Sequence, residues 1–161
     1  MGLTRRQFVH SIPMYLTYGL GAVICGTFAL WAAALYVALC IAGNLWYIRT
    51  ICVHCAAYGS GCPSGYNLLA RRMARPGGRR GFGRAFRRNV ASVVPCWFLP
   101  LLLGGLLLYV RSDPWNAMLL GIFCIMAFGV LPFGMRAEGC ARCPNRRHCP
   151  YTATHAGDGS R

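Results

Sequence analysis

Cysteines arranged in two similarly spaced triplets are the residues of this chain best suited to chemistry. The sequence contains ten cysteines, and six of them form the motifs Cys52-x2-Cys55-x6-Cys62 and Cys140-x2-Cys143-x5-Cys149. Each triplet follows an apolar stretch, and in each a proline comes directly after the third cysteine. A Cys-x2-Cys turn brings two thiolates onto one tetrahedral metal ion, as in structural zinc sites. We therefore expect all six thiols to be ligands of a metal centre.

The identity of the metal stays open at this level, because six thiolates fit more than one arrangement. One iron–sulfur cluster would use four of them, and two zinc ions sharing thiolates would use all six. Two separate zinc ions would each need another ligand. His54 and His148 lie beside the triplets, but a histidine in such a position is more often hydrogen-bonded than bound to metal. The sequence thus predicts either zinc or an iron–sulfur cluster as the cofactor.

The first triplet also carries a resemblance. The segment CVHCAAYGSGCPSG, residues 52–65, resembles a Cys-x2-Cys-x2-Tyr-Gly-x2-Cys-x2-Gly signature of small, uncharacterised prokaryotic polytopic membrane proteins. The resemblance covers about fifteen residues and implies no activity. In spacing alone, the first triplet is similar to half of the fungal binuclear zinc-cluster motif. The second is similar to part of the auxiliary iron–sulfur motif of radical enzymes.

Three long apolar stretches must position these cysteines, and they predict an all-α integral membrane helical bundle. They are Ile12–Ile48, Val90–Val110 and Trp115–Met135. A helical span needs about 20 residues, so the first stretch is long enough for two spans. We expect four transmembrane helices, the first two near Phe8–Gly26 and Phe28–Ile48 with a turn at Gly26-Thr27. Residues 1–135, including a Cys/Arg-rich loop at 49–89, would form the membrane domain, and residues 136–161 a cytoplasmic tail.

The distribution of charge supports an even number of spans. The formal net charge is +14, and every basic residue except Arg111 lies near the N-terminus, in residues 49–88 or in residues 136–161. Basic residues mark cytoplasmic segments. Four spans place all three segments on that side, whereas three spans would not. We therefore expect a multi-pass protein of the inner (cytoplasmic) membrane with both termini in the cytoplasm.

Arginines in the first loop are expected to bind lipid. Clusters of basic residues beside a span attract anionic headgroups, and the expected lipid-binding residues are Arg71, Arg72, Arg75, Arg79, Arg80, Arg84, Arg87 and Arg88. The interleaved glycine and phenylalanine residues are also found in RNA-binding segments. The neighbouring spans already explain the charge, so nucleic acid is not an expected partner.

The segment Thr4-Arg5-Arg6 resembles the start of a twin-arginine export signal. Two arginines before a first membrane helix are also expected from topology alone. The sequence leaves this alternative open.

Four further cysteines, Cys25, Cys40, Cys96 and Cys124, lie singly in the apolar stretches. Cysteine behaves as a small hydrophobe, so we expect these four to pack. Gly26, Gly104 and Gly105 are expected to let helices approach one another closely.

Three functions fit the whole pattern. The leading hypothesis is a membrane-adjacent cysteine metal centre with a structural or electron-transfer role. A membrane thiol–disulfide oxidoreductase is an alternative, because a four-helix protein with paired cysteines resembles the quinone-linked disulfide-forming enzymes. Transport of, or resistance to, a soft metal is another. The only carboxylates are Asp113, Glu138 and Asp158, so paired-carboxylate hydrolysis is not supported, and whether the protein is an enzyme stays open.

Overall fold

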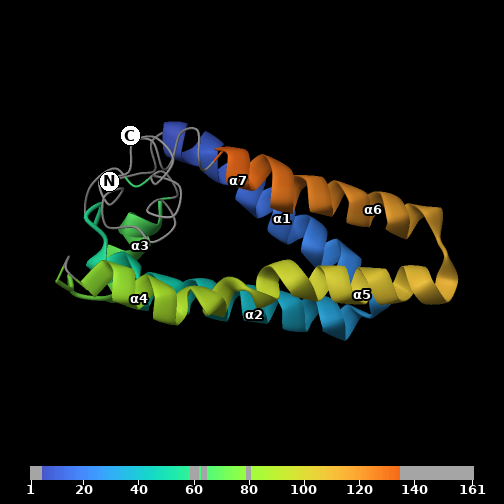
Figure 1. Ribbon diagram of the computed structural model, residues 1–161, viewed down its shortest axis with the longest axis horizontal. Helices are drawn as coiled ribbons and strands as arrows, with labels where there is room; N and C mark the ends of the chain where they lie inside the picture. Colours follow the sequence, from blue (N-terminus) through green and yellow to red (C-terminus); the bar gives the residue numbers. More distant parts are fainter. Residues whose placement is uncertain (1–4, 59–61, 63–64, 79–80, 135–161) are drawn as a thin grey trace, which may run out of the picture. The chain divides into compact units, whose positions relative to one another are not determined.

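The computed structural model describes the chain except for residues 1–4, 59–61, 63–64, 79–80 and 135–161. Every element among the described residues is helical, and none of them forms a strand (Figure 1). The α-helices are α1 (Arg5–Phe28), α2 (Leu30–Thr50), α3 (Tyr66–Met73), α4 (Phe82–Asn89), α5 (Pro95–Arg111), α6 (Pro114–Cys124) and α7 (Leu131–Gly134). Between them lie the 3₁₀ segments η1 (Cys52–His54) and η3 (Val90–Val93) and the π-helical segment η4 (Ile125–Val130).

Four helical segments are long and apolar enough to cross a membrane. They are Ser11–Phe28, Leu30–His54, Phe82–Arg111 and Pro114–Gly134. The predicted all-α membrane fold with four spans is therefore confirmed. The long first apolar stretch does divide into two helices, as the distribution of arginines required.

The turn between the first two spans lies at Ala29, not at the predicted Gly26-Thr27. The Thr27 hydroxyl donates a hydrogen bond to the Ile24 carbonyl within α1 (2.7 Å), so this polar residue is accommodated inside the helix. The Ala29 N–H still bonds to the Cys25 carbonyl (3.1 Å), while the Ala29 carbonyl already accepts from Ala32 (3.0 Å). One residue thus ends α1 and begins α2.

The helix that contains the third span begins earlier than the predicted Val90. Helix α4 starts at Phe82 inside the arginine-rich segment and leads through η3 into α5. The rings of Phe82 and Phe86 stack one turn apart, with centroids 5.9 Å apart. The Asn89 amide closes the last turn by donating to the Ala85 carbonyl (2.9 Å). Apolar residues at i and i+4 therefore make a helix of a segment whose composition suggested a loop.

The turn between α5 and α6 has clear local causes. Ser112 adopts a left-handed conformation (φ 47°), which ends α5. The Asp113 carboxylate then accepts a hydrogen bond from the Trp115 N–H (3.1 Å), and Pro114 occupies the first turn of α6. An aspartate cap followed by proline is a strong start signal for a helix.

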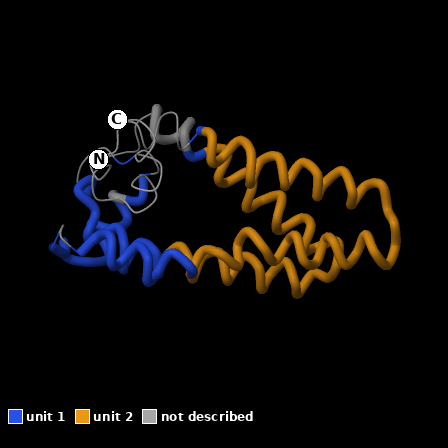
Figure 2. The backbone as a smooth tube through the Cα atoms, viewed as in Figure 1, with its two compact units in different colours: residues 1–11, 45–91, 134–161 blue, residues 12–44, 92–133 orange. Residues whose placement is uncertain are grey.

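The chain divides into two compact units (Figure 2). Unit 2 comprises residues 12–44 and 92–133, and it contains most of each membrane-spanning helix. Unit 1 comprises residues 1–11, 45–91 and 134–161, and its described part carries the first cysteine triplet. The predicted tail, residues 136–161, lies outside the described residues.

The interior of unit 2 consists of two clusters of buried side chains. One joins α1 to α6 and η4 through Ile24, Leu119, Phe123 and Ala127. A Cβ atom at Gly104 would lie 3.0 Å from a methyl group of Ile24, so glycine permits this approach, whereas nothing lies within 4 Å of such an atom at Gly105. The other cluster consists of Cys25, Ala32, Tyr36, Cys40 and Cys96.

Candidate metal centre

The first two cysteines of the first triplet belong to one tight turn at the end of α2. The 3₁₀ segment η1 begins at Cys52, and the Cys55 N–H bonds back to the Cys52 carbonyl (3.1 Å). Cys55 itself is extended (φ −74°, ψ 137°) and starts the following loop. The x2 spacing therefore forms the kind of turn that the sequence predicted.

The thiol of Cys55 accepts a hydrogen bond from the backbone. The Ala57 N–H points at the Cys55 Sγ atom, with nitrogen and sulfur 3.4 Å apart. The Tyr58 N–H bonds to the Cys55 carbonyl (2.9 Å), which fixes the backbone that carries the Ala57 donor. Hydrogen bonds of this kind stabilise a thiolate and tune a metal bound to it.

Two long-range hydrogen bonds tie this loop to the segment that follows α3. The Gly77 N–H donates to the Val53 carbonyl (2.8 Å). The Tyr58 hydroxyl donates to the Ala74 carbonyl (2.7 Å). Residues 53–58 and 74–77 thus hold each other in place. This gives Tyr58 a structural role in the loop that carries the first triplet.

His54 lies on the glycine-rich backbone of the same segment. Its Nδ1 atom is 3.0 Å from the Gly78 carbonyl oxygen. A Cβ atom at Gly77 would come within 2.5 Å of the imidazole ring, and one at Gly81 within 3.2 Å. Glycine at these positions therefore makes room for the ring. With Nδ1 engaged by a carbonyl, Nε2 is the nitrogen available to a ligand.

The third cysteine of the triplet lies just before α3. The Gly65 N–H bonds to the Cys62 carbonyl (3.2 Å). Gly65 has a φ of 71° and immediately precedes the first residue of α3, Tyr66. A positive φ favours glycine, which accounts for glycine at position 65. The Tyr66 ring packs on Tyr47 of α2, with centroids 6.3 Å apart.

Within the described part of the chain, no group of three or more cysteine, histidine or acidic side chains is arranged to hold a metal ion. Cys52, Cys55 and Cys62 are all among these residues, so the structure does not arrange the three thiols of the first triplet around one metal ion. The second triplet, Cys140, Cys143 and Cys149, lies outside the described residues. Whether the two triplets meet stays a prediction.

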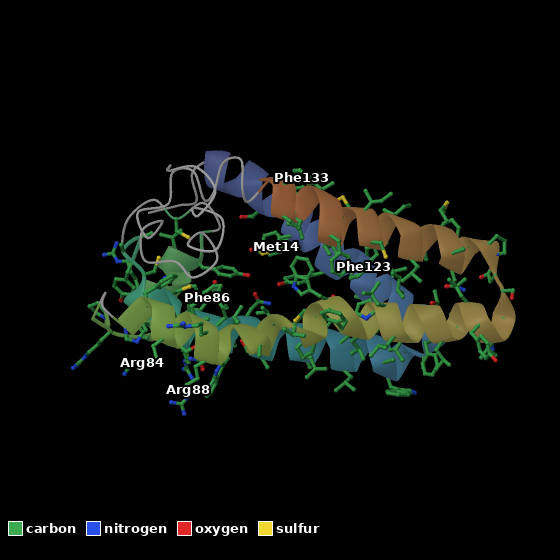
Figure 3. All side chains as sticks on the ribbon, viewed as in Figure 1. Met14, Arg84, Phe86, Arg88, Phe123 and Phe133 are labelled. Carbon is green, nitrogen blue, oxygen red and sulfur yellow. The ribbon has the colours of Figure 1, made fainter. Side chains whose placement is uncertain are left out.

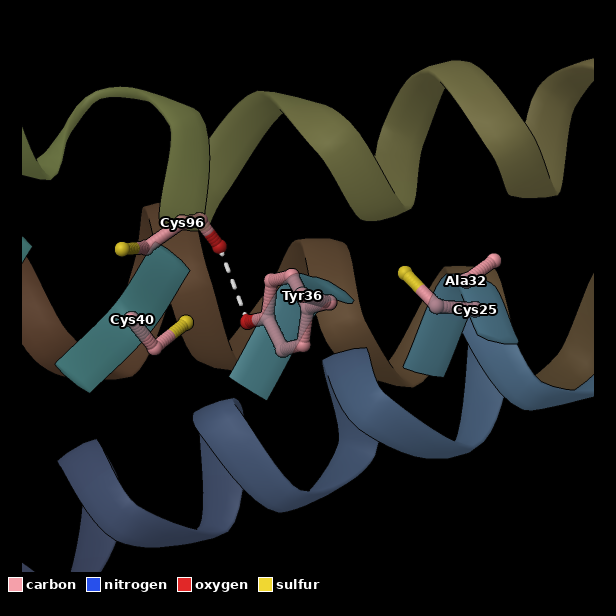
Figure 4. Close-up of a cluster of buried hydrophobic side chains, with 5 residues drawn as sticks. All are labelled: Cys25, Ala32, Tyr36, Cys40 and Cys96. Carbon is pink, nitrogen blue, oxygen red and sulfur yellow. Dashed lines mark hydrogen bonds between the residues drawn. The ribbon is translucent and has the colours of Figure 1, made fainter. Parts of the chain in front are cut away.

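Three of the four single cysteines come together in unit 2, which the sequence reasoning did not foresee. Cys25 of α1, Cys40 of α2 and Cys96 of α5 are all buried in one cluster (Figure 4). Cys124 does not belong to it and is only partly buried. The expectation that these residues pack is confirmed for the first three.

Tyr36 organises that cluster. Its hydroxyl donates to the Cys96 carbonyl (2.9 Å), and the residue is only 1% exposed. In a helix the carbonyl of residue 96 would accept from the N–H of residue 100, but Pro100 has none. Tyr36 supplies the missing donor. A Cβ atom at Gly21 would collide with the tyrosine hydroxyl, so α1 leaves space for it. Proline four residues after Cys96 is the sequence feature from which a carbonyl in need of another donor could have been predicted.

The arginine-rich loop exposes its charge. The described arginines of the predicted lipid-binding set are all exposed, namely Arg71, Arg72, Arg75, Arg84, Arg87 and Arg88. Arg79 and Arg80 lie outside the described residues. On α4, Arg84 and Arg88 point away from the helix on the side opposite Phe86 (Figure 3). Phe82 is 7% exposed, so α4 has one apolar and one cationic face.

Comparison with known proteins identified no relative: no protein-family model matches the chain, and neither a curated protein nor a solved structure matches it significantly.

Proposed function

We propose that the two cysteine triplets form one membrane-adjacent metal centre, with zinc or an iron–sulfur cluster bound by Cys52, Cys55 and Cys62 together with Cys140, Cys143 and Cys149. The observation that carries the proposal is the hydrogen bond from the Ala57 N–H to the Cys55 sulfur. A backbone donor aimed at sulfur favours the thiolate, which is the form that binds metals.

The surrounding loop supports a site of this kind. The bonds from Gly77 to Val53 and from Tyr58 to Ala74 hold the turn on two sides. A metal-binding turn that is fixed in advance loses less conformational entropy on binding. The first triplet supplies three thiols, one fewer than a tetrahedral centre needs. The second triplet is the richest source of further thiolates in the sequence.

Two roles fit such a centre. A zinc ion would clamp the loop to the tail and stabilise the fold, since binding free energy at a structural site is folding free energy. An iron–sulfur cluster would transfer electrons, with a potential set by the hydrogen bonds to its sulfur ligands and by solvent exposure. The Ala57 donor would contribute to either role.

Elemental analysis of protein purified without oxygen or chelators tests the proposal. We expect stoichiometric zinc, or iron with sulfide and visible absorption, in the unmodified chain. Cys52→Ser and Cys140→Ser should each lose the metal, while the matched control Cys124→Ser should retain it. Metal content unchanged in both triplet variants would refute the proposal. Absence of metal together with a reversible Cys52–Cys55 disulfide would favour the thiol–disulfide oxidoreductase instead.

We also propose that the centre faces the cytoplasm at the inner membrane and that the exposed arginines bind anionic lipid there. The support is the concentration of basic residues before the first span, between the second and third spans and after the fourth. The turn at Ser112 would then face outward. In intact cells, a membrane-impermeant maleimide should label Ser112→Cys and leave the unmodified chain unlabelled. The reverse pattern would invert the topology.

A further inference from the structure

Helix α2 presents one face to Cys96. Tyr36, Cys40 and Gly43 are spaced i, i+4 and i+7, which places them on the same side of a helix. Tyr36 contacts the Cys96 carbonyl by its hydrogen bond of 2.9 Å. A Cβ atom at Gly43 would lie 3.9 Å from the Cys96 sulfur and 2.5 Å from the Ser92 carbonyl oxygen. The face therefore touches α5 and the turn before it on both sides of Cys40.

The Cys40 thiol lies between these two contacts and beside the Cys96 thiol. Its side chain belongs to the same buried cluster as those of Cys96 and Tyr36 (Figure 4). Both cysteines are buried, with Cys40 7% and Cys96 1% exposed. The Tyr36 ring separates the pair from Cys25, which lies on its other side (Figure 4). Two helices thus bring two thiols together in a water-poor interior.

The number of ligands selects the kind of metal. Zinc prefers four ligands, and the described residues contain no group of three suitable side chains. Soft sulfur ligands select Cu(I). Cu(I) and the chemically similar Ag(I) form stable complexes with only two ligands. We propose that Cys40 and Cys96 bind one such monovalent soft metal ion between α2 and α5. This site is separate from the centre proposed for the triplets.

Charge balance is compatible with a monovalent ion at this site. Burying net charge in an apolar interior is costly. One thiolate and one thiol around M⁺ make a neutral complex, so binding releases one proton and transfers no electrons. The hydroxyl of Tyr36 donates to the Cys96 carbonyl, which leaves its oxygen able to accept from the thiol that keeps its proton. A divalent ion could also be neutralised, by two thiolates, but two ligands are fewer than the four that zinc prefers.

Competition with a chromophoric Cu(I) chelator tests the site on the full-length protein under reducing conditions. We expect Cys40→Ser and Cys96→Ser each to retain one Cu(I) equivalent fewer than the unmodified chain. Cys124→Ser, which alters a cysteine outside the cluster, should retain the full number. Any Cu(I) held by the triplets is the same in each variant and in the unmodified chain, so it does not affect these differences. Cys52→Ser reports separately on the centre proposed for the triplets. Serine is close to cysteine in size, and equal unfolding midpoints would verify the fold.

Two results would overturn the proposal. One is an unchanged number of Cu(I) equivalents in both Cys40→Ser and Cys96→Ser. The other is an equal loss in Cys124→Ser, which would indicate unspecific binding to thiols. A direct measurement that avoids substitution of the pair is X-ray absorption of Cu(I) bound to a chain whose six triplet cysteines are serine. Two sulfur neighbours are expected, and a copper site without sulfur would contradict the assignment.

Discussion

The hydroxyl of Tyr36 in α2 donates a hydrogen bond to the carbonyl of Cys96 in α5, with the two oxygens 2.9 Å apart. This bond replaces one that Pro100 cannot make, because proline has no N–H for the carbonyl four residues before it. A buried carbonyl without a donor is costly in a membrane interior. The contact therefore compensates for a backbone defect, and that role can be measured.

Replacing Tyr36 with phenylalanine should destabilise the protein by about 1 kcal/mol, the usual net value of such a bond. The reason is that the Cys96 carbonyl would lose its donor. The free energy of unfolding, measured with denaturing detergent in mixed micelles, reports the loss. In a Pro100→Ala background the same change should cost less, since residue 100 would then have an N–H for the carbonyl. Equal costs in both backgrounds would show that the two residues act independently.

Replacing Gly77 with alanine should loosen the loop that carries the first triplet. The new Cβ atom would strike the imidazole of His54, to which the Gly77 backbone lies close. Faster alkylation of the triplet cysteines by a maleimide, and weaker retention of metal, are the expected readouts. Gly78→Ala is the matched control, because nothing lies within 4 Å of a Cβ atom at that position.

The double variant His54→Ala, Gly77→Ala sharpens that test. Removing the ring relieves the collision, so Gly77→Ala should add little to the effect of His54→Ala alone. If the two effects simply add, the ring is not the reason for glycine at position 77.

Replacing Arg84, Arg87 and Arg88 together with glutamine should reduce the enrichment of anionic lipid around the protein. Each arginine near a charged surface contributes about 1 kcal/mol, and these three lie on the exposed side of α4. Native mass spectrometry of protein released from mixed-lipid nanodiscs would count the retained lipids. The difference should shrink as salt rises, because salt screens exposed charges.

Arg111→Gln is the control for that experiment. Arg111 ends α5, at the other end of the third span, and its loss should leave the enrichment nearly unchanged. Equal enrichment in the triple variant and the unmodified chain would remove the support for a lipid-binding loop.

The spans could be predicted from sequence because length, apolar content and arginine placement determine them almost alone. The even number of spans followed from the positions of Arg5, Arg6 and the two later basic segments. The turn at Ala29 could not be predicted, since Thr27 bonds within its own helix and gives no signal. Helix α4 was missed because glycine and arginine suggested a loop, while the decisive contact is between Phe82 and Phe86.

The candidate site was predictable only in its composition. Spacing indicated the turn at Cys52 and Cys55, but it could not give the donor at Ala57 or the position of His54 on Gly77. Those features depend on how residues 53–58 meet residues 74–81. The convergence of Cys40 and Cys96 needs the rotation of α2 about its axis, which an almost uniformly apolar sequence does not specify.

The arrangement around Tyr36 has a consequence for how related sequences should differ. Gly21 makes room for the hydroxyl, Tyr36 carries it, and Pro100 leaves the acceptor that needs it. The space at position 21, the donor at position 36 and the missing N–H at position 100 each matter only when the other two are present. In homologues we therefore expect positions 21, 36 and 100 to change as a set. A homologue with leucine at 36 should tolerate a larger residue at 21 and should lack proline at 100.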